Sequence, residues 1–143
     1  MSKSHNMPGW RIGVLASNRQ FVEWVLRVKS NMDSGMFKAL QLAAVQEWYV
    51  QMNKVYAARK ALAQAILEKV GAEVAPGQVG LFLWGKVAGK GVDICDDVLY
   101  KAKVFITPGF IFGSNGENYI RISLCANEET LSKALERIEK ELQ

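Results

Sequence analysis

The sequence predicts a mixed α/β (α+β) fold in two parts, a helical segment over residues 1–70 and a small two-layer α/β domain over residues 71–143. Apolar residues recur at three- and four-residue spacing in the first part, which is typical of amphipathic helices. After Glu73, short apolar runs alternate with helical stretches and are separated by turn residues such as Pro76-Gly77. Hydrophobic residues make up 50% of the 143 residues, so the chain can bury a core.

The first part opens with a short strand-like run over residues 11–16. Ser17 and Gln20 then match a capping box, in which a hydroxyl at the cap is followed three residues later by glutamine. The helix that follows carries apolar residues at helical spacing, namely Phe21, Val22, Val25, Leu26 and Val28. A second helical stretch, either two helices or one bent helix, is predicted to begin near Met36. It should end at Gly71, because glycine commonly follows the C-terminus of a helix.

The second part is predicted to contain three strands and two helices. The strands are expected over residues 79–87, 104–107 and 119–124, and the helices over residues 93–102 and after the capping residue Asn127. The last helix should bury one stripe of side chains, Leu131, Leu135, Ile138 and Leu142. This unit of roughly seventy residues is large enough to hold one core, so we expect it to fold without residues 1–70.

Composition excludes several classes of partner. The net charge is +4, and the basic residues are scattered without a run of five or six like charges, so we predict no nucleic-acid and no membrane partner. The longest nearly uncharged stretch, residues 104–115, is too short to span a bilayer. Residues 1–20 lack the apolar region of a secretory signal, and we therefore expect a cytoplasmic protein.

The cysteines and the histidine limit the kinds of site that the chain can form. Cys95 and Cys125 occur without any secretory feature, so we expect both to be reduced thiols buried in the core. His5 is the only histidine, which excludes a multi-histidine metal site, and we predict no metal.

A motif near the start of the chain combines a serine, a lysine and an arginine flanked by glycines: SKSHNMPGWRIG, residues 2–13. It resembles the lysine segment of class I/II aminotransferases, which are fold-type I pyridoxal-phosphate (PLP) enzymes. The resemblance implies that Lys3 is the catalytic lysine that binds PLP as a Schiff base and that Arg11, eight residues later, holds the PLP phosphate. It makes Ser2 a minor phosphate ligand. Without the resemblance, Lys3 and Arg11 would be interpreted as solvated surface side chains.

A second match lies at residues 119–123, where this family keeps the arginine that binds the substrate α-carboxylate. Period-two alternation independently places Arg121 on the face opposite Ile120 and Ile122, where its guanidinium can reach a cleft without crossing the core. A lone arginine on an edge strand would instead be solvated or ion-paired. Phe112, in the glycine-rich approach to this strand, could line the substrate pocket or serve only in packing.

The resemblance covers essentially the whole chain. It implies that residues 1–70 are the C-terminal remnant of the large PLP-binding domain with its interdomain helix, and that residues 71–143 are the small C-terminal domain. Residues 30–37 are similar to a family loop at the dimer interface, although a plain helix–helix connection explains them equally well. Because apolar side chains of residues 21–70 would lack cover, we expect a homodimer or a higher oligomer.

The same resemblance implies that several PLP ligands lie upstream of residue 1: a stacking aromatic residue, an aspartate on the pyridine nitrogen, and an asparagine and a tyrosine on O3′. We therefore expect that the chain alone binds PLP weakly and does not transfer an amino group between an amino acid and a 2-oxo acid. Two alternatives stay open. One is another fold-type I PLP enzyme, such as a carbon–sulfur lyase, a synthase or a decarboxylase; the other is a stand-alone, non-catalytic binding domain.

Overall fold

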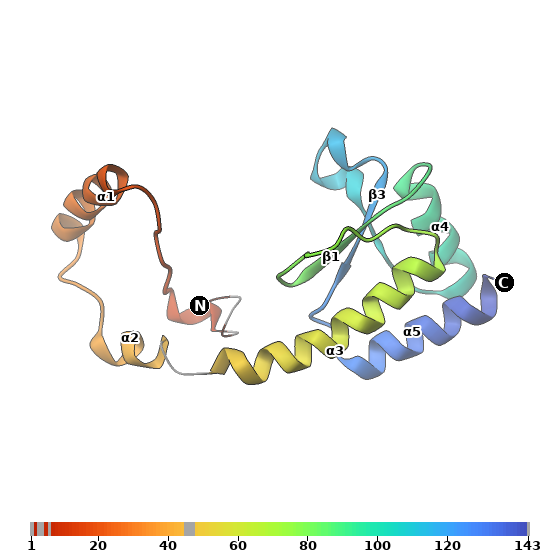
Figure 1. Ribbon diagram of the computed structural model, residues 1–143, viewed down its shortest axis with the longest axis horizontal. Helices are drawn as coiled ribbons and strands as arrows, with labels where there is room; N and C mark the ends of the chain where they lie inside the picture. Colours follow the sequence, from red (N-terminus) through yellow and green to blue (C-terminus); the bar gives the residue numbers. More distant parts are fainter. Residues whose placement is uncertain (1, 3–4, 6, 45–47, 143) are drawn as a thin grey trace. The chain divides into compact units, whose positions relative to one another are not determined.

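The computed structural model describes residues 2, 5, 7–44 and 48–142 (Figure 1). The chain divides into two compact units, Met1–Asn53 and Lys54–Gln143, and the division falls inside a long helix. The regular structure of the first unit is helical, and the second unit contains helices and a small sheet. This combination confirms the predicted mixed α/β fold class. None of the helices in the described ranges has an apolar stretch of membrane-spanning length.

The first unit contains the 3-10 helix η1 (Pro8–Trp10), the helices α1 (Arg19–Met32) and α2 (Lys38–Ala44), and the start of α3 (Trp48–Lys69). The capping residue of α1 is Asn18, whose side-chain oxygen accepts a hydrogen bond from the Phe21 N–H at 3.0 Å. The predicted cap at Ser17 is therefore wrong by one residue. The long helical stretch predicted from Met36 is present as α2 and α3, and residues 45–47 between them lie outside the described residues.

The predicted strand over residues 11–16 is not formed. The segment has no regular secondary structure, and the described part of the first unit contains no strand with which it could pair. Five of its six residues are exposed, and Ile12 alone is buried. A strand needs a neighbour to satisfy its backbone hydrogen bonds, so the local β propensity of this run is not sufficient.

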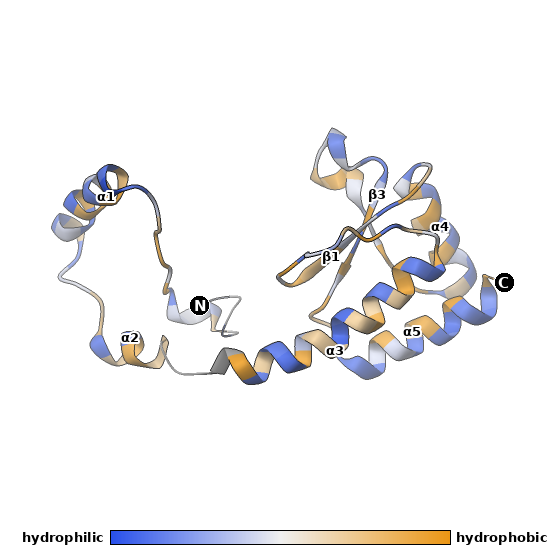
Figure 2. Cartoon of the chain, viewed as in Figure 1, coloured by the Kyte–Doolittle hydropathy of each residue, from blue (hydrophilic) through white to orange (hydrophobic). Residues whose placement is uncertain are grey.

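Helix α1 has an apolar side that the first unit leaves exposed. Figure 2 shows hydrophobic bands along α1 between hydrophilic ones. Phe21 and Trp24 contact each other edge to face, with ring centroids 5.3 Å apart, yet about half of each side chain is exposed. Val25, Leu26 and Val28 are exposed as well, so the helical spacing predicted for these residues is present without a buried core behind it.

The second unit is built on a three-stranded antiparallel sheet with the order β1-β3-β2. Its strands are β1 (Phe82–Lys86), β2 (Thr107–Pro108) and β3 (Tyr119–Ser123). The central strand β3 pairs with both neighbours, whereas β2 is shorter and later than the predicted strand over residues 104–107. Helix α4 (Gly91–Ala102) connects β1 to β2, and α5 (Glu128–Glu141) follows β3.

The core lies on one face of this sheet. Ile120 and Ile122 of β3 are buried there with residues of all three helices of the unit: Ala63, Ile66 and Leu67 of α3, Cys95 and Val98 of α4, and Leu131 and Ile138 of α5. Leu135 and Leu142 pack against the core and are partly buried, so the predicted stripe of α5 faces inward. Helix α3 ends at Lys69, and Gly71 follows its C-terminus as predicted, with a φ of 76° in the left-handed region that favours glycine.

The two cysteines differ, contrary to the prediction that both lie in the core. Both are free thiols; Cys95 is buried and Cys125 is exposed. Burial, with a smaller contribution from the Asp96 carboxylate, raises the pKa of Cys95 from 9.0 to about 11. Cys125 lies in the turn between β3 and α5, where an apolar residue type does not imply a buried position.

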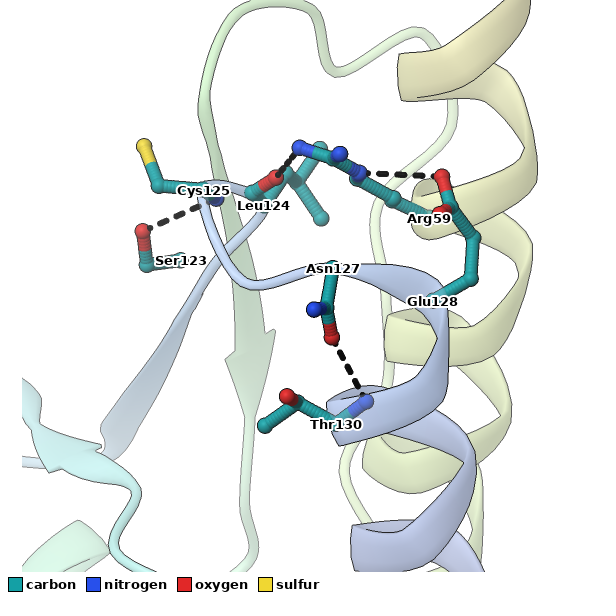
Figure 3. Close-up of polar contacts among 7 residues, drawn as sticks. All are labelled: Arg59, Ser123, Leu124, Cys125, Asn127, Glu128 and Thr130. Atoms are coloured by element: carbon teal, nitrogen blue, oxygen red, sulfur yellow. Dashed lines mark hydrogen bonds and ion pairs between the residues drawn. The ribbon is translucent and has the colours of Figure 1, made fainter.

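A polar cluster ties α3 to the end of β3 and to the start of α5 (Figure 3). Arg59 of α3, with only 17% of its side chain exposed, donates from Nε to Glu128 Oε1 at 3.0 Å and from Nη1 to the Leu124 carbonyl at 3.3 Å. Asn127 caps α5 as predicted, because its side-chain oxygen accepts from the Thr130 N–H at 2.8 Å. The pKa of the Glu128 carboxyl is held below its ordinary value of 4.5. The main cause is a hydrogen bond from the Glu128 backbone N–H, and the hydrogen bond from the Arg59 guanidinium comes second.

We expect the folding unit of the second part to begin near Lys54 and not near Gly71. A chain of residues 71–143 would lose the buried side chains of Ala63, Ile66 and Leu67. Each large core side chain removed costs about 2–5 kcal/mol, against a total stability of about 5–15 kcal/mol for a domain. Denaturant titration should therefore show a cooperative transition for residues 54–143 and none for residues 71–143. A cooperative transition in the shorter chain would restore the boundary predicted near Gly71.

The Arg59–Glu128 pair should contribute stability that acid removes. Because the folded-state pKa of Glu128 is lowered, this contribution is present above about pH 4.5 and is lost as the pH falls through the folded-state pKa. Arg59→Met should lower the Tm at neutral pH, and the difference from the unmodified chain should shrink as the pH is lowered. Lys133→Met, which removes the exposed pair with Glu129, is the matched control and should change the Tm little. A difference that does not depend on pH would contradict this role of the pair.

Candidate functional site

The residues of the N-terminal motif lie in the first unit. Lys3 falls outside the described residues, and Ser2 is half-buried. Arg11 directly follows η1, has a left-handed φ of 50°, and is exposed. Its Nη1 donates to the Pro8 carbonyl at 3.5 Å, and no other hydrogen bond or ion pair joins its guanidinium to a described residue. The remaining donors of Arg11 can therefore hold two oxygens of a phosphate, so this residue fits the phosphate group of PLP.

Arg121 lies at the centre of the sheet in the second unit. In the strand register it stands opposite Trp84 of β1 on one side and Thr107 of β2 on the other. Its neighbours along β3, Ile120 and Ile122, are buried, while Arg121 is only half-buried. The predicted alternation is thus correct, and Arg121 lies on the open face of a central strand and not on an edge strand.

Aromatic rings surround the Arg121 guanidinium. The guanidinium carbon lies 4.1 Å from the ring centroid of Phe82, 3.9 Å from that of Phe112 and 5.9 Å from that of Trp84. No carboxylate among the described residues forms an ion pair with Arg121, and its buried Nε has no hydrogen-bond partner there. The site therefore holds a cation that the described part of the protein does not neutralise.

Two glycines position Phe112 beside Arg121. Phe112 ends the short 3-10 helix η2 (Gly109–Phe112), which is followed by η3 (Ser114–Gly116). A Cβ atom added to Gly109 would overlap the carbonyl oxygens of Gly116 and Tyr119, and one added to Gly116 would overlap the Gly109 carbonyl. Only glycine permits this close backbone approach, which holds the loop against the start of β3.

A cleft of about 460 Å³ adjoins this region at the β2 edge of the sheet, and Arg121 and Thr107 are among its lining residues. Its charged lining residues are all basic: Lys103, Arg121, Lys133 and Arg137. Such a lining attracts anions. Among the residues that the structure describes, no three His, Cys, Asp or Glu side chains gather in a way that could hold a metal ion.

The structure brings Arg121 and Phe112 together, whereas Ser2 and Arg11 belong to the other unit. Sequence reasoning did not identify Phe82 and Trp84 as neighbours of Arg121. A signal for them exists, because both lie in the predicted strand over residues 79–87 at positions of the same parity. Their contact with Arg121 depends on the strand register, which the sequence of either strand does not specify.

Comparison with known proteins identifies the family. The model of the family "Aminotransferase class I and II" matches residues 1–138. The LL-diaminopimelate aminotransferase of Nitratidesulfovibrio vulgaris is 35% identical over 147 residues, which cover 96% of this chain and 38% of that protein. The LL-diaminopimelate aminotransferase of Aquifex aeolicus is 37% identical over 146 residues, with the same coverage. The chain thus spans about 38% of the length of these curated relatives.

Solved structures agree with this assignment. A protein of Methanococcus jannaschii, whose active site is described as similar to those of kynurenine aminotransferases, is 30% identical to the chain with a TM-score of 0.77, over 99% of this chain and 40% of that one. The aspartate aminotransferase of Thermotoga maritima is also 30% identical, with a TM-score of 0.69, over 99% of this chain and 38% of that one. From the family match and these relatives together, the chain belongs to the class I and II aminotransferases.

Proposed function

We propose that this chain supplies the C-terminal part of a PLP-dependent aminotransferase, which transfers an amino group between an amino acid and a 2-oxo acid. The observation that carries the proposal is the Arg121 guanidinium, which lies on the open face of β3 without a carboxylate partner among the described residues. A planar guanidinium binds both oxygens of a carboxylate, which both substrates of a transamination possess. This contact would orient the amino acid for reaction.

The roles of the other site residues follow from the chemistry of the family, whose enzymes depend on PLP. When bound, PLP supplies an electron sink for the carbon that loses a proton. The Lys3 amine would hold the cofactor covalently and, once released, move the proton. Arg11, with Ser2 as a minor ligand, would hold the phosphate, because the Arg11 guanidinium is exposed and largely free of other hydrogen bonds. Phe112 would border the carboxylate end of the substrate.

The identity of the amino acid is a narrower question. The relatives cited above act, by name, on LL-diaminopimelate, and this amino acid is therefore the first to test. The similarity to an aspartate aminotransferase makes aspartate the second. The proposed ligand of Arg121 is the α-carboxylate, which all these amino acids share. Arg121 therefore does not distinguish between these substrates. A cytoplasmic location stays a prediction from the sequence.

We further propose that the first unit mediates self-association. Phe21 and Trp24 are about half exposed, and Phe37 is 71% exposed. Exposed apolar side chains such as these tend to be buried by association with a partner. A second copy of the chain is the proposed partner, in agreement with the homodimer expected from the sequence.

The chain alone should bind PLP weakly. Arg11 offers one charge-assisted contact of about 1.5–3 kcal/mol, whereas micromolar affinity needs about 8 kcal/mol. Lys3→Ala should change this weak binding little in an absorbance titration. Replacing the matching residues of the Nitratidesulfovibrio vulgaris aminotransferase with this chain should restore PLP binding and transamination. In that chimera, Lys3→Ala should abolish activity.

Arg121→Ala in the same chimera should raise the KM for the amino acid about 10- to 100-fold, the loss of one charged hydrogen-bonded contact, and leave the PLP absorbance unchanged. The KM of the Arg121→Lys variant should lie between that of the unmodified chimera and that of Arg121→Ala.

Tight stoichiometric PLP binding by the 143-residue chain would contradict the need for further residues. A folded, PLP-bound chimera that transaminates no amino acid would contradict the proposed activity.

Self-association should depend on the apolar side of α1. Sedimentation should detect a dimer or a larger species of the chain, and Phe21→Ser combined with Trp24→Ser should shift it toward monomer by removing exposed aromatic area. Arg27→Ser, on the same helix, removes no aromatic surface and is the control. A strictly monomeric chain at high concentration would overturn this proposal.

A further inference from the structure

The two phenylalanine rings nearest to Arg121 come from opposite sides of β3. Phe82 lies on β1, where it pairs with Ser123 and is a diagonal neighbour of Arg121. Phe112 belongs to η2, which directly follows β2 on the other side of β3. Both ring centroids are about 4 Å from the guanidinium carbon, the distance of van der Waals contact. The rings therefore hold the guanidinium from two directions.

A guanidinium has weakly hydrated faces and strong donors around its edge. Aromatic rings attract a cation through their faces and accept no strong hydrogen bond, so they cover the group without neutralising it. At Arg121 one edge is closed as well, because Nε is buried and has no partner among the described residues. The edge formed by Nη1 and Nη2 is not buried in this way, and these two nitrogens are the donors left for a ligand.

We propose that Phe82 and Phe112 form an aromatic clamp, which fixes the Arg121 guanidinium so that it binds a carboxylate end-on, through Nη1 and Nη2. This inference rests on the proposed function and adds two elements to it: the direction of approach of the carboxylate, and a positioning role for Phe82. Trp84, opposite Arg121 in the register, supports the clamp through its edge-to-face contact with Phe112, with ring centroids 5.4 Å apart.

The clamp has a consequence for anion selectivity. The two oxygens of a carboxylate can lie in the plane of the guanidinium, between the two rings. A phosphonate has three oxygens in a tetrahedral arrangement, so at least one leaves this plane, and in the proposed clamp that oxygen would approach a ring. Charge alone would give the opposite preference, because a phosphonate dianion is attracted more strongly to a cation than a carboxylate is. The order of the two affinities therefore separates the clamp from a simple exposed cation.

The clamp itself can be tested without any ligand, by NMR of the arginine side chains in the 143-residue chain. The Arg121 Nε–H signal, assigned by its loss in Arg121→Lys, should exchange slowly with water and be shifted by ring currents. Phe82→Leu and Phe112→Leu keep apolar volume but remove the rings, and each should speed the exchange about tenfold. Phe82→Tyr keeps a ring and should preserve the slow exchange.

Phe110→Leu is the matched control, because Phe110 lies in the same 3-10 helix as Phe112 and is equally exposed, at 49% against 48%. It should leave the Arg121 signal unchanged. An Arg121 Nε–H that exchanges as fast as that of Arg27, whose exposed guanidinium forms no hydrogen bond or ion pair with a described residue, would overturn the clamp. So would an exchange rate that does not respond to either leucine substitution in a folded chain.

Titration with propionate and with ethylphosphonate tests the end-on approach. Millimolar propionate should shift the Nη signals of Arg121 while its Nε–H stays protected, and ethylphosphonate should bind more weakly. Equal or stronger binding of ethylphosphonate would overturn the end-on approach. If the Nε–H is protected but neither anion binds, the clamp stands and the proposed carboxylate role of Arg121 fails. The failure of the clamp and that of the proposed function are thus distinguishable.

Discussion

The pairing of β3 with a strand on each side determines on which face of the sheet each strand residue of the second unit's site lies. Leu83 and Ile122 pair on the core face, and Trp84 and Arg121 pair on the open face. A slip of one residue in this register would place the Arg121 cation in the core and Ile122 in solvent, at a cost that the small domain could not bear. The same hydrogen bonds that stabilise the sheet therefore also present the arginine, and the stability of the core protects the geometry of the site.

The surroundings of Arg121 illustrate how a protein can hold a cation ready for a ligand. A half-buried arginine is usually accompanied by a carboxylate, which satisfies its charge but competes with any incoming anion. Here the contacts are aromatic, and no carboxylate of the described residues forms an ion pair with the guanidinium. In the clamp proposed above, the rings hold the guanidinium in place while its charge remains available. The basic lining of the adjacent cleft adds an attraction for anions that does not depend on contact.

The features that could be predicted from the sequence are those that depend on local rules. The alternation at residues 119–124 predicts the face of Arg121, and the caps at Asn127 and Gly71 follow from the side chain or backbone freedom of one residue. Features that need a distant partner were missed. Residues 11–16 have strand-like composition but no strand beside them in the described part of their unit, and the contact of Phe82 with Arg121 arises from the register of two strands.

The close approach of Gly109 and Gly116 has a consequence for how this protein can change over time. Gly109 and Gly116 meet through their backbones, and a Cβ atom at either position would overlap the carbonyl oxygen of the other. The Phe112 side chain takes no part in this backbone contact, so position 112 can be substituted while the contact remains. Evolution can alter the surroundings of Arg121 through position 112 without rebuilding the turn, whereas a side chain at either glycine would force the two backbones apart. The capacity for new specificity and the intolerance to mutation are therefore separated by a few residues within a single loop.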